Sequence, residues 1–128
     1  MTTASFKSGW VTFAGVTALV AGAYNGLSGL STLAADYPQI EQVEKLLFGV
    51  RVDVWAWFWL VVGVVQALTG VLLLMRNIWG QMLGVGIAAL SALVALFGLF
   101  DWPLWAFSVL MLDMLVLYAL LTHGDEFD

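Results

Sequence analysis

Asp113 is the residue in this sequence with the strongest potential for chemistry. It lies near the middle of the apolar run 103–122, which predicts a membrane-spanning helix. A carboxyl group at the bilayer centre costs roughly 3 kcal/mol on insertion scales, so it is expected to face the inside of a bundle and to be neutralised or paired there. No other acidic or basic side chain lies deep in an apolar run. Asp113 is therefore the position at which a proton or a cation would be handled.

Gln66 and Asn25 are the other strongly polar side chains at depth. Unsatisfied polar groups in hydrocarbon cost several kcal/mol each, so all three side chains are expected to point inward and to seek one another. Gln66 and Asp113 lie at similar predicted depths, which favours a direct hydrogen bond between them. Asn25 is a second candidate partner, somewhat past the centre of its helix. The sequence thus predicts an intramembrane polar cluster of Asp113, Gln66 and Asn25.

Two interpretations of this cluster remain open. In the first, a protonated Asp113 donates a hydrogen bond to Gln66 or Asn25 and fixes the register of the helices. In the second, Asp113 cycles its proton in transport, or binds a cation or a polar headgroup. The site has one carboxylate, no deep cation and no helix broken by Gly or Pro of the transporter type. These features favour the first interpretation.

The remaining residues argue against enzymatic chemistry. The sequence has no cysteine and one histidine, His123, which lies at its polar C-terminal end. We therefore expect no catalytic residues, no metal site and no cofactor. The formal net charge of −5 argues against a nucleic-acid partner, which requires a basic patch. Asp125, Glu126 and Asp128 form a short acidic tail that we expect to be solvated.

The elements that must position these side chains are four apolar helices. The chain has 128 residues, of which 62% are hydrophobic and 10% charged, so lipid is the expected solvent. Four runs are close to the roughly 20 residues that a spanning helix needs. They cover residues 10–33, 54–75, 79–100 and 103–122. We predict one all-α domain over residues 1–128, a polytopic antiparallel bundle of four transmembrane helices in the plasma membrane, with membrane lipids around it.

Polar residues mark the ends of these helices. Ser8, Asp53 and Asp101 are expected to cap the first, second and fourth helices. Pro103 suits the first turn of the fourth helix, and Gly124 its end. Tight turns at 76–78 and 101–102 predict that the last three helices are antiparallel neighbours. Between the first two helices, apolar residues at helical spacing predict a short amphipathic helix on the membrane surface. These residues are Ile40, Val43, Leu47 and Val50.

Tryptophans and small residues complete the pattern. Tryptophans at or near the helix starts predict an interfacial aromatic belt, because amphipathic rings prefer the headgroup region. This belt comprises Trp10, Trp55, Trp57, Trp79, Trp102 and Trp105. Small residues at every fourth position predict close helix contacts, within the chain or between chains. They are Ala18, Gly22 and Gly26 in the first helix and Gly80, Gly84, Ala88 and Ala92 in the third.

The sequence also resembles a family of small four-helix membrane proteins of unknown function that is common in actinobacteria. The resemblance rests on four segments, which are residues 9–15, 23–30, 78–84 and 112–120. It implies four spanning helices with both termini on one side, and it includes Asn25 and Asp113 in the family pattern. Many relatives carry a histidine early in the second helix. The present sequence has Trp57-Phe58-Trp59-Leu60 there, which argues against a proton relay that requires this histidine.

Three hypotheses about function follow. The first is a non-enzymatic structural or accessory subunit that associates with itself, as a homo-oligomer, or with a larger membrane complex. The second is a small proton- or cation-coupled transporter or channel that uses Asp113. The third is binding of a lipid or quinone between helices.

The orientation in the membrane is only weakly determined by the basic residues. Lys7 and Arg76 fall on one side of the membrane, and Lys45 and Arg51 on the other, so the number of Lys and Arg residues is the same on both sides. Because Lys7 and Arg76 flank their helices directly, we expect both termini in the cytoplasm.

Overall fold

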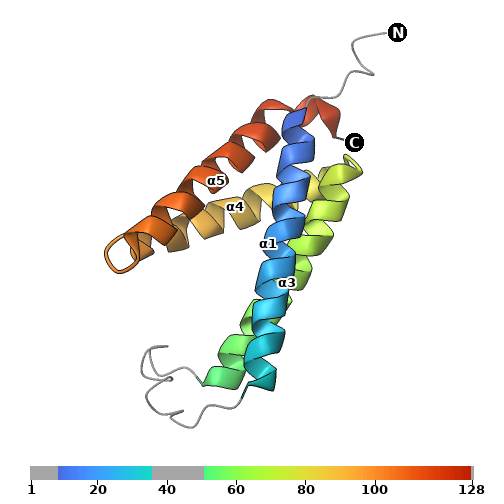
Figure 1. The fold of residues 1–128 in the computed structure, drawn as a ribbon. Helices are drawn as coiled ribbons and strands as arrows, with labels where there is room; N and C mark the ends of the chain where they lie inside the picture. Colours follow the sequence, from blue (N-terminus) through green and yellow to red (C-terminus); the bar gives the residue numbers. More distant parts are fainter. Residues whose placement is uncertain (1–8, 36–50, 128) are drawn as a thin grey trace. The chain divides into compact units, whose positions relative to one another are not determined.

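A computed structural model describes residues 9–35 and 51–127, and its regular elements are all helical (Figure 1). They are α1 (Gly9–Ala34), α3 (Val52–Leu74), α4 (Ile78–Gly98), α5 (Pro103–Thr122) and the short 3-10 helix η2 (Gly124–Glu126). The four α-helices are each long and apolar enough to cross a membrane. The all-α class is therefore confirmed. Each predicted run begins and ends within two residues of a helix. The predicted amphipathic helix at 40–50 and the cap at Ser8 lie outside the described residues.

The chain divides into two compact units. Unit 1 comprises residues 9–19 and 68–127 of the described chain, and unit 2 comprises residues 20–35 and 51–67. Helices α1 and α3 therefore contribute one part to each unit. Helices α4 and α5 belong wholly to unit 1, where they contact each other.

Unit 1 contains the main hydrophobic cluster, which draws its side chains from all four α-helices and from the residue after η2. Its buried members are Val11, Ala14, Leu73, Ala88, Val116, Ala119, Leu120 and Phe127. Many of these side chains are small, as expected where close helix packing replaces the hydrophobic drive that lipid removes.

The helix ends in unit 1 are set by different residues from those predicted. Asn77 caps α4, since its side-chain oxygen accepts a hydrogen bond of 2.9 Å from the backbone N–H of Trp79. Helix α5 begins with Pro103 in its first turn, as expected, but its N-cap is Trp102, without a side-chain bond. The predicted cap at Asp101 is therefore wrong, because the helix starts one residue too late for it.

In unit 2, α3 begins at Val52, so Asp53 lies inside the first turn and does not precede it. The predicted capping role of Asp53 is therefore also wrong. Its Oδ1 accepts a hydrogen bond from the N–H of Val54, and its Oδ2 pairs with Arg51 at 2.7 Å. A carboxylate in a first turn still interacts favourably with the helix dipole.

Helices α1 and α3 meet along glycines that recur every seven residues. In unit 2, a Cβ added at Gly22 would lie 2.5 Å from the backbone nitrogen of Ala67, and one added at Gly29 would lie 2.6 Å from that of Leu60. A Cβ added at Gly63 would overlap the backbone nitrogen of Gly26. Only glycine permits such backbone approach. A seven-residue period is the one that keeps a single seam facing its partner helix.

The same period continues in unit 1, where Gly15 lies opposite Gly70. A Cβ at Gly70 would lie 2.8 Å from the carbonyl oxygen of Gly15, whereas one at Gly15 would first meet the side chain of Leu74, at 2.7 Å. The four-residue series Ala18, Gly22, Gly26 was therefore an incomplete description of this seam. Ala18 is half-buried and packs against the hydrophobic cluster of unit 1.

The small residues of α4 are used within unit 1. Gly80 lies against the backbone of Leu72, and Gly84 against the side chain of Leu120, with hypothetical Cβ distances of 2.7 Å in both cases. Ala88 is buried, while Ala92 is only half-buried, and Ala95 is the next buried residue. The buried face of α4 thus follows helical geometry beyond Ala88 and departs from a strict four-residue repeat.

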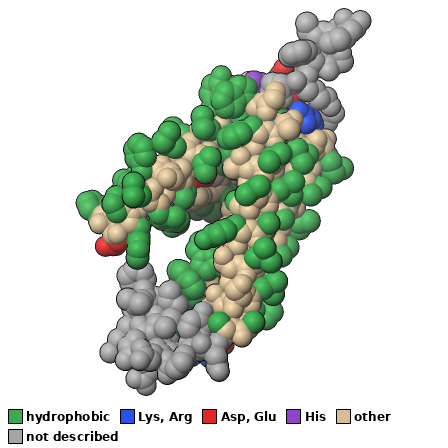
Figure 2. All heavy atoms as spheres, in the orientation of Figure 1, with side chains coloured by type: hydrophobic (Ala, Val, Ile, Leu, Met, Phe, Trp, Pro, Cys, Tyr) green, Lys and Arg blue, Asp and Glu red, His purple; other side chains and the backbone are tan. Residues whose placement is uncertain are grey.

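Apolar side chains are spread along the visible surface of all the helices (Figure 2). Five of the predicted belt tryptophans are between 38% and 70% exposed, namely Trp10, Trp57, Trp79, Trp102 and Trp105. Trp55 is half-buried and packs beside Phe58 and Trp59. All six lie at or near the start of a helix. This placement suits side chains that lie between hydrocarbon and headgroups.

Candidate functional site

Asn25 and Gln66 form a direct bond between α1 and α3 in unit 2. The Nδ2 group of Asn25 donates to Oε1 of Gln66 over 2.6 Å, and both residues are half-buried. The close glycine contacts on both sides of this pair bring the two helices near enough for short amide side chains to meet. Both groups are neutral, so the pair satisfies polar atoms in an apolar segment without holding a charge.

Asp113 lies midway along α5 in unit 1, and its side chain is hydrogen-bonded to Ser91 of α4. Both residues are half-buried. The second carboxyl oxygen, Oδ2, is buried and has no hydrogen-bond partner among the described residues. A carboxyl group in this position keeps one oxygen available for a proton or for a further donor.

The structure thus divides the predicted cluster into two pairs. It joins Asn25 to Gln66 in unit 2, and it places Asp113 with Ser91 in unit 1. Sequence reasoning missed Ser91. A signal was present, because Ser91 and Gln81 are the only hydroxyl or amide side chains of α4. A small hydroxyl group deep in an apolar helix can form a hydrogen bond with a polar side chain of a neighbouring helix, as an amide can.

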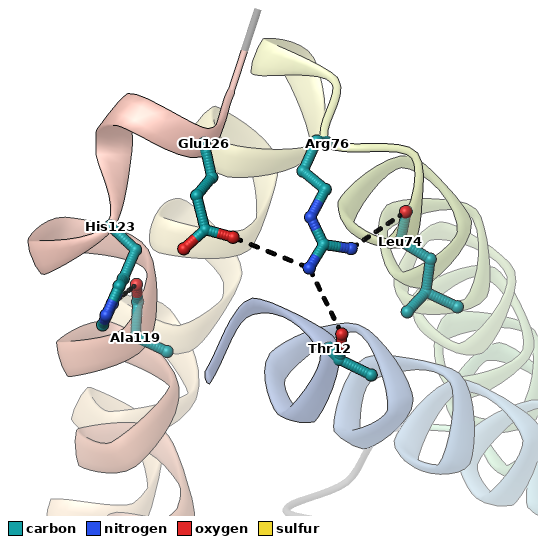
Figure 3. Close-up of polar contacts among 6 residues, drawn as sticks. All are labelled: Thr12, Leu74, Arg76, Ala119, His123 and Glu126. Atoms are coloured by element: carbon teal, nitrogen blue, oxygen red, sulfur yellow. Dashed lines mark hydrogen bonds and ion pairs between the residues drawn. The ribbon is translucent and has the colours of Figure 1, made fainter. Parts of the chain in front are cut away.

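A second set of polar contacts in unit 1 is centred on Arg76, in the turn between α3 and α4 (Figure 3). Its Nη1 donates to the carbonyl oxygen of Leu74 at 3.2 Å, and its Nη2 donates to Oγ1 of Thr12 on α1 at 3.3 Å. The same Nη2 lies 3.6 Å from Oε1 of Glu126. The side chains of Arg76 and Glu126 are only 12% and 9% exposed. This ion pair is therefore largely withdrawn from water.

Two further side chains hold the end of α5. Nδ1 of His123 donates to the carbonyl oxygen of Ala119 at 3.0 Å, and Nε2 of Gln81 donates to that of Leu120 at 2.8 Å. These bonds satisfy carbonyl groups that a helix end leaves without partners.

The expectation of a solvated acidic tail is wrong for Glu126. Glu126 pairs with Arg76, and Phe127 is 7% exposed within the hydrophobic cluster of unit 1. Asp125 is exposed as expected, and Asp128 lies outside the described residues. Charge content alone suggested solvation, but the adjacent Phe127 supplied an apolar anchor.

The arrangement can fix helix register in each of the two units and can hold one proton at Asp113. In the described part of the chain, His and acidic side chains form no group of three or more that could hold a metal ion.

The comparisons give one family match. A family model described as a domain of unknown function, DUF7144, matches residues 10–125. No curated protein and no solved structure matches the chain.

Proposed function

The chain belongs to the DUF7144 family, and we propose that it acts as a non-enzymatic structural or accessory subunit that packs against itself or a larger membrane complex. Its four long apolar helices indicate a membrane protein. The Asn25–Gln66 and Asp113–Ser91 pairs support a structural role, since each joins two helices by a hydrogen bond.

The observation that carries this proposal is an exposed stripe on α5. Its residues recur at alternating spacings of three and four, and each is at least 49% exposed. The stripe consists of Leu104, Phe107, Met111, Met114, Tyr118 and Leu121. This is the spacing with which one helix packs along another. Two methionines at its centre can adapt to an irregular partner surface. We infer that the stripe contacts a helix of a second copy or of another membrane protein.

Photo-crosslinking in intact membranes tests this inference. A photoreactive residue at Met111 or Met114 is expected to give a protein adduct of discrete mass. The same residue at Leu90 or Val94, which are equally exposed on α4, is the matched control and is expected to give mainly lipid adducts. Absence of protein adducts from the stripe, together with a monodisperse monomer after gentle extraction, would contradict the proposal.

Proton- or cation-coupled transport through Asp113 is the second candidate function. The observation that favours it is the buried Oδ2 atom without a partner among the described residues. Under the structural proposal, vesicles containing the wild-type chain and vesicles containing Asp113→Asn are expected to leak protons no faster than protein-free vesicles. A pH-sensitive dye inside the vesicles measures this flux. Wild-type flux that Asp113→Asn abolishes, with the fold retained, would favour transport instead.

We also propose that the chain lies in the plasma membrane with both termini in the cytoplasm. Support comes from Lys7 and Arg76, which flank α1 and α3 on the side of the termini. Because the chain has no native cysteine, Asp101→Cys in the α4–α5 turn can report orientation. A membrane-impermeant maleimide should label it from outside the cell.

A further inference from the structure

Unit 2 carries a group of neutral polar side chains within its apolar helices. Tyr24 and Ser28 are four residues apart on α1, and Asn25 and Ser28 are three apart, so the three share one side of the helix. Asn25 bonds to Gln66 of α3, which adds a fourth member. Tyr24 is 72% exposed, and the other three residues are half-buried. Together, Tyr24, Asn25, Ser28 and Gln66 are called the polar patch below.

The polar patch has hydrogen-bonding capacity that unit 2 does not use. A side-chain amide has an acceptor oxygen and an NH2 group with two donors. The bond from Nδ2 of Asn25 to Oε1 of Gln66 therefore leaves the oxygen of Asn25 and the NH2 group of Gln66 for other partners. Within residues 9–35 and 51–127, neither group makes another hydrogen bond, and the hydroxyl groups of Tyr24 and Ser28 make none. The patch can thus bind a further polar partner.

The depth of the patch excludes water and lipid headgroups as that partner. Tyr24 and Asn25 are about 4 Å and about 5 Å from the midpoint of α1, at a rise of about 1.5 Å per residue. The hydrocarbon core extends about 15 Å to either side of its centre. The remaining distance of about 10 Å exceeds the length of either side chain. Polar groups without partners are strongly disfavoured at this depth.

The chemistry of the patch fits a second copy of the chain. Amides and hydroxyl groups both donate and accept, so the patch is complementary to itself. A ligand that only accepts, such as a quinone, would bind the NH2 group of Gln66 and the hydroxyl group of Tyr24 but would leave the oxygen of Asn25 without a donor. A second copy in the same orientation presents its own patch at the same depth, because their twofold axis is the membrane normal.

We propose that the polar patch is a contact between two copies of the chain, in which the free amide and hydroxyl groups of one copy bond to those of the other. Ala21 lies one turn before Asn25 on the same side of α1, and its small side chain lets a second helix approach. This inference rests on the proposed function and names one of its partners. The contact lies in unit 2, whereas the stripe of α5 lies in unit 1, so the two surfaces can be tested separately.

Crosslinking of single cysteines in intact membranes tests the position of the contact, since the chain has no native cysteine. Ser28→Cys replaces one oxygen of the patch by sulfur. With a short, membrane-permeant bis-methanethiosulfonate, it is expected to give a product of twice the chain mass. Ala23→Cys is the matched control, because Ala23 is exposed on the other side of α1. It is expected to stay monomeric.

Removal of one hydroxyl group tests the chemistry of the contact. Tyr24→Phe leaves the fold of unit 2 intact, since this hydroxyl group has no partner in the described part of the chain. A dimer contains the group twice, so the dissociation constant is expected to rise about tenfold. Energy transfer between donor- and acceptor-labelled copies in lipid vesicles measures it. Ser108→Ala is the control, because the Ser108 hydroxyl group is already bonded to Leu104 within α5, and no change is expected.

The outcomes separate this inference from the proposed function. Absence of a double-mass product from Ser28→Cys, an equal yield from Ala23→Cys, or unchanged dimerisation of Tyr24→Phe would overturn the patch contact. A crosslinked product of another mass would identify a different protein as the partner and would overturn it too. If protein adducts still formed from the stripe of α5, the proposed function would stand without this contact.

Discussion

Substitution of Gly63 by leucine is expected to separate α1 from α3 and to lower the stability of unit 2 by about 3 kcal/mol, near the upper end of typical overpacking costs. A Cβ at this position would overlap the backbone nitrogen of Gly26 and lie 2.6 Å from the carbonyl oxygen of Gly22. These are backbone atoms of an intact helix, which cannot rotate away as a side chain can. The whole seam, including the Asn25–Gln66 bond, would have to open.

Gly86→Leu is the matched control, because no atom of another helix lies within 4 Å of a Cβ at Gly86. Both substitutions gain about 1 kcal/mol of helix propensity at most, so their difference isolates the steric cost. Unfolding by a denaturing detergent, followed by circular dichroism, measures both. Equal stability of the two variants would show that α1 and α3 do not pack closely at Gly63.

Replacement of Arg76 by methionine is expected to have the second large effect, a loss of about 3–5 kcal/mol. Methionine keeps much of the apolar stem but removes the cation that lies 3.6 Å from Oε1 of Glu126, whose side chain is only 9% exposed. Removing both charges in Arg76→Met/Glu126→Gln is expected to recover much of this loss, because replacing a buried ion pair with uncharged groups is often close to neutral. The backbone cost at position 76, where φ is 55°, is the same for arginine and methionine.

The exposed pair of Arg51 and Asp53 provides the comparison. Its side chains are 73% and 50% exposed, so Arg51→Met is expected to cost at most about 1 kcal/mol. Unfolding by a denaturing detergent ranks the stabilities of four proteins. These are the wild type, Arg76→Met, Arg76→Met/Glu126→Gln and Arg51→Met. If the Arg76 and Arg51 variants lost equal stability, burial of the Arg76–Glu126 pair would not matter to the fold.

The helices were predictable because apolar length is a strong signal and few polar residues interrupt it. The runs ending at Leu33 and Thr122 coincide with helix ends to within one residue. Caps were less predictable, since Asp53 and Asp101 lie near a helix start but a shift of one residue changes their role. Asn77 became a cap through its extended backbone, which composition does not show.

The polar residues that bond between helices could be identified from the sequence, but their partners could be predicted only in part. Depth estimates matched Gln66 with Asp113, whereas the structure joins Gln66 to Asn25, because backbone contact at glycines brings α1 and α3 close together. Glycines at positions 15, 22 and 29 already show the seven-residue period in the sequence, but the four-residue series Ala18, Gly22, Gly26 overlaps it and obscures it. The Glu126–Arg76 pair joins residues that local patterns cannot relate.

The Asn25–Gln66 bond also has a consequence for biogenesis. Its two residues are 41 positions apart in the chain. At about 5–20 residues per second, the ribosome delivers Gln66 roughly two to eight seconds after Asn25. During that interval the Asn25 amide lacks its partner and is costly to leave in lipid. This cost is avoided if α1 stays beside the insertion machinery until α3 emerges. The two helices would then enter the bilayer as a pair.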